Sequence, residues 1–235
     1  ESKEIKLVAE PTEAELEIVN AYQPAGGRER QGAEGRGLLD EYYTPGDVVT
    51  MVETALSGLG VYRDGMRILE PSVGIGNFVW GVPETASVDG YEINEKSARI
   101  AKLNHTGMRV YNLPFESIFM TDRGQKKKFG PTYDLIIGNP PYGDHRGKYL
   151  GLGEETKIGR YEEYFIKRAL DITNDGGYVA MVVPSGFLRG SVNVAKEHIS
   201  NLGKLVSAYR LPNGAFDTTD IGTDIVIFQR SDKEV

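Results

Sequence analysis

The stretch that most constrains the fold is residues 134–142, with the sequence DLIIGNPPY. Its first part is an apolar run with two β-branched isoleucines, which is typical of a short buried strand. Two successive prolines then remove two backbone donors and fix two φ angles, so the strand cannot continue. Pro140 also keeps Asn139 out of the helical region. The sequence therefore predicts a stiff corner at the carboxyl end of a buried strand, where open α/β sheets bind ligands.

This corner presents an amide side chain, a free carbonyl group and an aromatic ring. The side-chain oxygen of Asn139 and the carbonyl of Pro140 are two hydrogen-bond acceptors held at a fixed angle. Such a pair suits a planar –NH2 group, and the ring of Tyr142 offers a flat face for stacking. The pattern predicts a site for an exocyclic amine or a carboxamide. The alternative is that the two prolines merely end a strand and that Tyr142 packs in the core.

Strand-like and helical patterns alternate along the chain, which predicts an α/β fold with a doubly wound, mostly parallel sheet. Seven strands are expected, at residues 67–70, 87–91, 108–111, 134–137, 178–183, 205–211 and 225–229. The last two are expected to close the sheet as an antiparallel pair. Three helices carry start signals. Thr12 and Glu15 have capping-box spacing, Asn94 is a predicted N-cap, and Thr44 is a predicted N-cap with Pro45 at the first helical position.

The composition is that of a soluble globular protein with one large domain. The 235 residues include no cysteine and three histidines, which makes a disulfide or a protein zinc site unexpected. No apolar run approaches the ~20 residues of a membrane span, and a cytoplasmic setting fits. Residues 24–37 are rich in glycine and charge, so we expect an N-terminal helix and flexible linker over 1–37 and one folded domain over 38–235.

The net charge of −7 argues against a broad nucleic-acid-binding surface, because such surfaces depend on lysine and arginine. The chain begins with Glu1 and not with methionine, which indicates a domain cut from a larger polypeptide. If the domain acts on DNA, we expect most of the basic contacts to come from elsewhere.

A second motif follows the strand at 67–70. That strand ends in the acid Glu70, and the next residues carry glycines at 74 and 76, which permit a tight turn and close approach of a ligand. Glu92 ends the following strand, close to the spacing of about 20 residues at which an acid binds ribose hydroxyls. Two acids without a phosphate-binding fingerprint favour an adenosine that bears a sulfonium group and an amino acid. Phe115 is either a ring that stacks on adenine or a core residue.

Together these elements resemble the amino-methyltransferases that use S-adenosylmethionine. The resemblance rests on four segments, in this order: Tyr42-Tyr43-Thr44-Pro45, Leu69-Glu70-Pro71-Ser72-Val73-Gly74-Ile75-Gly76, Tyr91-Glu92 and Asn139-Pro140-Pro141-Tyr142. With the Tyr-Thr-Pro element first, the order is similar to that of one group of N6-adenine DNA methyltransferases. The resemblance implies a Rossmann-like methyltransferase domain.

The resemblance also implies roles for individual residues. Around the cofactor S-adenosylmethionine it implies Tyr43, Thr44, Glu70, Ser72, Gly74, Gly76, Glu92 and Phe115. It implies a catalytic group of Asn139, Pro140, Pro141 and Tyr142. Tyr142 and Phe216 would flank the target base, and no metal site is expected. Many relatives have an aspartate before the ring-stacking phenylalanine, where this chain has Pro114. Glu116 is the alternative partner for the adenine amine of the cofactor.

The predicted function is methyl transfer to N6 of a flipped-out adenine in DNA, within a restriction-modification or mobile-element system. No target-recognition domain is evident, so we expect weak DNA binding by this domain alone and a further domain or recognition subunit. Two alternatives remain open: methylation of a glutamine side chain or of RNA, and a non-catalytic interaction module. A nicotinamide oxidoreductase is disfavoured, because the phosphate-binding fingerprint is missing.

Overall fold

The structure is a computed structural model that describes residues 4–7, 9–20, 44–120, 130, 132–143, 158–216 and 221–231. The predicted flexible segment at 24–37 and Tyr43 lie outside the described residues, as does most of the loop that follows the Asn-Pro-Pro-Tyr corner. Within the described helices, none is long and apolar enough to cross a membrane.

A seven-stranded sheet forms the centre of the molecule, in the order β3-β2-β1-β4-β5-β7-β6. Its strands are β1 (Arg67–Glu70), β2 (Ser87–Tyr91), β3 (Arg109–Tyr111), β4 (Tyr133–Gly138), β5 (Thr173–Pro184), β6 (Gly203–Arg210) and β7 (Thr223–Arg230). Neighbouring strands from β3 to β5 pair in parallel, whereas β7 is antiparallel to both β5 and β6. The predicted mostly parallel sheet with an antiparallel C-terminal strand is therefore confirmed.

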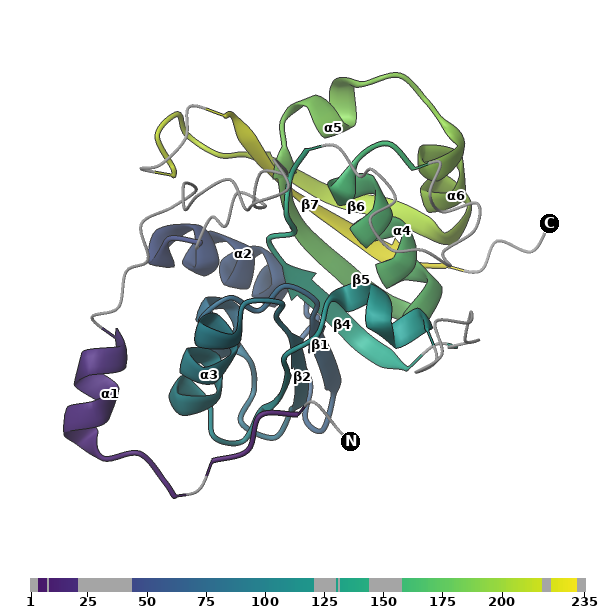
Figure 1. Cartoon of the computed structure of the whole chain (residues 1–235). Helices are drawn as coiled ribbons and strands as arrows, with labels where there is room; N and C mark the ends of the chain where they lie inside the picture. Colours follow the sequence, from purple (N-terminus) through teal and green to yellow (C-terminus); the bar gives the residue numbers. More distant parts are fainter. Residues whose placement is uncertain are drawn as a thin grey trace, which may run out of the picture.

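Helices cover both faces of this sheet (Figure 1). The helices are α1 (Glu13–Asn20), α2 (Gly46–Gly58), α3 (Glu95–Asn104), α4 (Tyr161–Ile172), α5 (Gly186–Arg189) and α6 (Val194–Leu202), with 3-10 turns η1 (Asn77–Gly81) and η2 (Phe115–Phe119). Leu135 and Ile137 join the core cluster under α2 and α3, and Ile136 joins the cluster under α4 and α6. Because alternate strand residues point to opposite faces, the apolar run of β4 serves both clusters.

Two of the predicted helix starts are confirmed, and one is wrong. The Thr12 amide donates to Glu15 Oε2 at 2.8 Å, and Asn94 Oδ1 accepts from the amides of Lys96 and Ser97. Thr44, however, does not cap α2. Pro45 is the N-cap instead, because its ψ of 150° is extended and its carbonyl accepts the first helical hydrogen bond.

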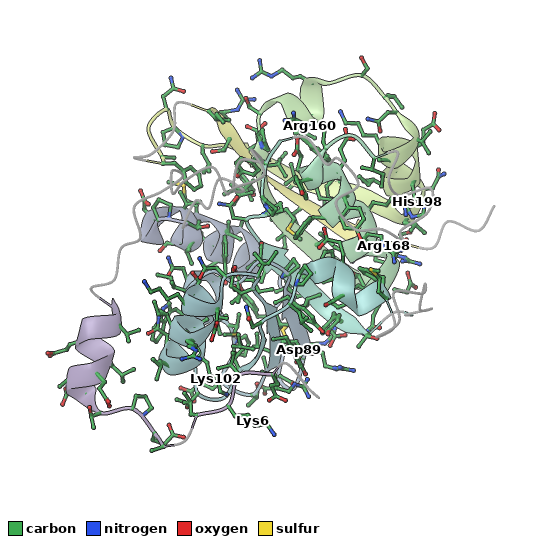
Figure 2. All side chains as sticks on the ribbon, viewed as in Figure 1. Lys6, Asp89, Lys102, Arg160, Arg168 and His198 are labelled. Carbon is green, nitrogen blue, oxygen red and sulfur yellow. The ribbon has the colours of Figure 1, made fainter. Side chains whose placement is uncertain are left out.

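An ionic cluster joins α4 to α6 on the face away from α2 (Figure 2). Asp171 receives hydrogen bonds from Arg168 at 2.7 Å and from His198 at 2.7 Å, and Lys167 lies 3.4 Å away. Burial alone would raise the pKa of Asp171, but the His198 bond and the two cations outweigh it and hold that pKa below its ordinary value.

Candidate active site

An open cavity lies where the carboxyl ends of the parallel strands β1, β2 and β4 meet. Its empty space, which includes open solvent, is about 930 Å³. The turn after β1, the end of β2, the segment before and into η2, and Asn139 to Pro141 line it, with Tyr161 and Phe165 of α4 on the remaining side. The two motifs that the sequence singled out thus open onto one cavity.

The Asn-Pro-Pro-Tyr corner is held in place by hydrogen bonds from two sides. The Ser72 hydroxyl donates to the Asn139 carbonyl at 3.1 Å, which ties the corner to the turn after β1. The Tyr142 hydroxyl lies 2.5 Å from Asn139 Oδ1 and 3.3 Å from the carbonyl of Val182 on β5. The first contact identifies Oδ1 as a hydrogen-bond acceptor.

The carboxyl group of Glu70 is buried at the wall of this cavity. Its side chain is only 2% exposed, and Oε2 has no hydrogen-bond partner among the residues that the structure describes. Burial, and secondly the nearby charge of Glu92, raise the pKa of Glu70 well above its ordinary value. A buried carboxyl group of this kind is best satisfied by a cationic or hydrogen-donating ligand.

Glu92 fixes the glycine turn, which we define as residues 73–77. Its Oε2 accepts from the amide of Gly74 at 2.9 Å, and its Oε1 accepts from the amide of Asn94 at 2.7 Å. Gly74 has a φ of 54°, a conformation that favours glycine. Glu92 therefore shapes the turn and lines the cavity with the same carboxylate.

Most of the predicted site residues line this one cavity. They are Thr44, Glu70, Ser72, Gly74, Glu92, Phe115, Asn139, Pro140 and Pro141. Gly76, Tyr142 and Phe216 are not among its lining residues. A Cβ atom on Gly76 would lie 2.6 Å from the His105 ring, so Gly76 is required for packing against that ring, and its role at the cofactor stays a prediction.

The ring of Phe216, which the resemblance implies beside a target base, is buried in the core. Phe216 is only 5% exposed and belongs to the core cluster that also contains Val48 and Leu211. Its ring is buried because it packs into the core cluster that lies under α2. A role for Phe216 beside a target base stays a prediction.

Sequence reasoning missed several residues of the cavity. Asn77 lines it and donates from Nδ2 to the carbonyl of Thr44 at 2.8 Å, which holds the segment before α2 against the glycine turn. Tyr161 and Phe165 have ordinary helical core spacing, so their pattern alone gave no functional signal. Burial, and secondly the charge of Glu116, raise the pKa of Tyr161 to about 12.

The sequence matches a family model over residues 86–213, which is more than half of the chain. The model is that of the Eco57I restriction-modification methylases. This chain belongs to that family. The family agrees with the predicted methyltransferase and with the restriction-modification context that was expected from the resemblance.

Two curated relatives of this Eco57I-family chain have sequences similar to it. It is 29% identical over 230 residues to the Defense against restriction protein B of Escherichia phage P1, covering 95% of this chain and 9% of that protein. It is 26% identical over 141 residues to the tRNA (guanine(6)-N2)-methyltransferase of Thermus thermophilus, covering 58% of this chain and 39% of that protein. The chain thus spans well under half the length of either relative.

Solved structures share the fold of this Eco57I-family chain. A protein of Listeria monocytogenes assigned to the class I S-adenosylmethionine-dependent methyltransferases superposes with a TM-score of 0.62 at 19% identity, over 82% of this chain and 62% of that one. The methyltransferase subunit of a type I restriction-modification system from Streptococcus thermophilus gives 0.60 at 18% identity, over 81% and 45%. The fold is that of class I S-adenosylmethionine-dependent methyltransferases, in agreement with the predicted cofactor.

Proposed function

We propose that this chain transfers a methyl group from S-adenosylmethionine to the exocyclic N6 of adenine in DNA. One observation carries the proposal: Asn139, with its side-chain oxygen positioned as an acceptor, and the glycine turn after β1 line the same cavity. This shared cavity supports a site for a flat amine beside a site for a nucleoside cofactor.

The residues of the cavity fit the cofactor's chemical groups. S-adenosylmethionine, when bound, supplies a methyl group made electrophilic by a sulfonium centre, and it also carries an ammonium group and ribose hydroxyls. Glu70, whose Oε2 lacks a partner among the described residues, suits the cationic part. Glu92 lines the cavity and suits ribose hydroxyls, and Phe115 offers a ring at its wall. Glu116 lies beside Phe115, is 3% exposed and lines the cavity, so it suits the adenine amine.

The corner acts on the target nitrogen. The lone pair of an adenine amine is delocalised into the ring, which makes the amine a poor nucleophile. Asn139 Oδ1 and the Pro140 carbonyl accept from its two N–H groups, which favours tetrahedral geometry and makes the lone pair available. Because positive charge grows on this nitrogen during the reaction, both acceptors bind the transition state more strongly than the ground state. Tyr142 orients Asn139 through its hydroxyl group.

The target adenine has to leave the duplex to reach this corner. Unstacking costs a few kcal/mol, and stacking on an aromatic ring returns about 1–3 kcal/mol per base. We assign that stacking to Tyr142. With a net charge of −7, the chain is a poor binder of duplex DNA by itself, and we propose that another domain or subunit supplies sequence recognition. Similarity to a type I methyltransferase subunit and to a much longer phage protein supports this arrangement.

The proposal is tested by transfer of labelled methyl groups to unmethylated genomic DNA. The unaltered chain should label N6 of adenine, and Asn139→Ala should lower the rate by at least about a hundredfold, the typical loss when one transition-state hydrogen bond is removed. Asn139→Asp keeps an acceptor oxygen and should retain part of the activity. Asn201→Ala, at an exposed position on α6, is the matched control.

Calorimetry with S-adenosylmethionine on the same variants separates a lost catalytic contact from a lost cofactor site. Equal activity of the unaltered chain and Asn139→Ala would rule out the assigned role of the corner. RNA is the second candidate substrate, favoured by similarity to a tRNA methyltransferase. Transfer to RNA in preference to DNA, at equal nucleotide concentration, would replace the DNA assignment with that one.

A further inference from the structure

The glycine turn is held from its far side by two side chains at the carboxyl end of α3. Asn104 Nδ2 donates to the carbonyl of Ile75 at 3.1 Å, and His105 Nε2 lies 2.8 Å from the carbonyl of Gly76. A carbonyl oxygen only accepts, so Nε2 carries the proton in this contact. Neither Asn104 nor His105 lines the cavity.

The His105 ring is confined on several sides. A Cβ atom on Gly76 would lie 2.6 Å from its Cδ2, so the ring packs directly against the glycine. The Trp80 ring lies over it with centroids 4.3 Å apart. Lys102, at the same end of α3 (Figure 2), donates to the carbonyls of Thr106 and Met108 and so fixes the loop that follows. The position of the His105 donor is therefore set by packing.

The turn consequently has supports on opposite sides, and both come from one β-α unit. Glu92, at the end of β2, binds the Gly74 amide on the cavity side. Asn104 and His105, at the end of α3, bind the next two carbonyls on the other side. The carbonyls of Ile75 and Gly76 are thus directed toward the end of α3 and bonded there.

We propose that Asn104 and His105 are positioning residues that preorganise the glycine turn for S-adenosylmethionine. The inference rests on the proposed function for the identity of the ligand. A turn that is already ordered loses less conformational freedom on binding, which increases affinity without any contact to the ligand. Burial lowers the pKa of His105, although the bond to the Gly76 carbonyl opposes the shift, so the ring that holds the turn is neutral at pH 7.

The test compares two replacements of His105 in the 235-residue chain. His105→Gln keeps an N–H donor at a similar distance from the backbone, whereas His105→Leu fills space without a donor. Calorimetry should give an S-adenosylmethionine affinity about tenfold weaker for His105→Leu and within about threefold of the unaltered chain for His105→Gln. In methyl transfer, the loss should fall on KM for the cofactor, with kcat at saturation within about twofold.

Hydrogen exchange without ligand gives a readout that is independent of activity. His105→Leu should speed exchange of amides in residues 72–80 and leave β5 unchanged, since only the turn loses a support. His198→Leu is the matched control, because it removes the bond of a half-buried histidine to Asp171 far from the cavity. It should lower stability without changing cofactor affinity.

Each outcome decides between the two proposals. Equal affinity and equal exchange in the unaltered chain and His105→Leu would overturn this inference and leave the proposed function standing. An equal loss of affinity in His105→Gln and His105→Leu would also overturn it, because space and not the donor would then matter. Absence of cofactor binding in the unaltered chain would overturn the proposed function and this inference with it.

Discussion

Replacing Glu70 by glutamine should make the ligand-free protein more stable and its cofactor binding weaker. Glu70 is 2% exposed, and its Oε2 has no partner among the described residues. Glutamine has nearly the same shape and carries no charge, so the cost of burying a carboxylate near Glu92 disappears. The variant also loses a charge-assisted hydrogen bond to a cationic group of the cofactor. Such a bond is worth about 1.5–3 kcal/mol, so the cofactor should bind roughly 10- to 150-fold more weakly.

The stability effect should depend on pH in a defined direction. The folded-state pKa of Glu70 lies above the ordinary value of 4.5, because burial and the charge of Glu92 both disfavour ionisation. Folded protein therefore binds more protons than unfolded protein in the window between the two values. The contribution of Glu70 to the free energy of unfolding is fully present below about pH 4.5. It is lost as the pH rises through the folded-state pKa of Glu70. Glu70→Gln has no such loss, so its stability relative to the unaltered chain should increase from pH 4.5 upward.

Urea unfolding of both proteins over a series of pH values measures this difference. Subtracting one curve from the other isolates Glu70, since every other titrating group is common to both. Calorimetry in buffers of different ionisation enthalpy should add a second result: cofactor binding releases protons from the unaltered chain and fewer from Glu70→Gln. Parallel pH curves, or equal cofactor affinity in the two proteins, would refute the assignment of Glu70 as the partner of a cationic group.

Two further predictions concern the helix layer and the DNA. Asp171→Asn should cost about 1.5–3 kcal/mol in urea unfolding at pH 7, because the hydrogen bonds from Arg168 and His198 lose their charged acceptor. The folded-state pKa of Asp171 is depressed below 3.8, so the cost of Asp171→Asn should persist above pH 3.8 and shrink as the pH falls through that folded-state pKa. An equal cost at pH 7 and pH 3 would contradict the ion-pair account. The chain alone should give no electrophoretic shift of duplex DNA at physiological ionic strength, and a tight, sequence-specific shift would show that it carries its own recognition surface.

Local patterns were predictable because their physical causes act over a few residues. The cap at Asn94 and the box at Thr12 and Glu15 depend on contacts across two or three positions, and the structure has them. The corner at Asn139 follows from two prolines after an apolar run. The alternation of strands and helices leads to the sheet, since parallel strands need helical crossovers.

Contacts between distant parts of the chain were not readable in this way. Ser72 meets the carbonyl of Asn139 across 67 positions, and His105 meets Gly76 across 29. No local pattern marks either pair, because the packing of α3 and the order of the strands bring them together. The burial of Phe216 was also not predictable from sequence. The turn around it is a local pattern, but its ring is buried by contact with the core cluster under α2.

The sequence by itself determined the elements, the rigid corner and the chemical character of the site. Only the tertiary structure decided which of these residues share one cavity, and that Gly76 faces α3 while Gly74 faces the ligand space. The physical reason is that backbone stiffness, capping and turn formation are encoded within a few neighbouring residues. The direction in which a side chain finally points depends on every element packed around it.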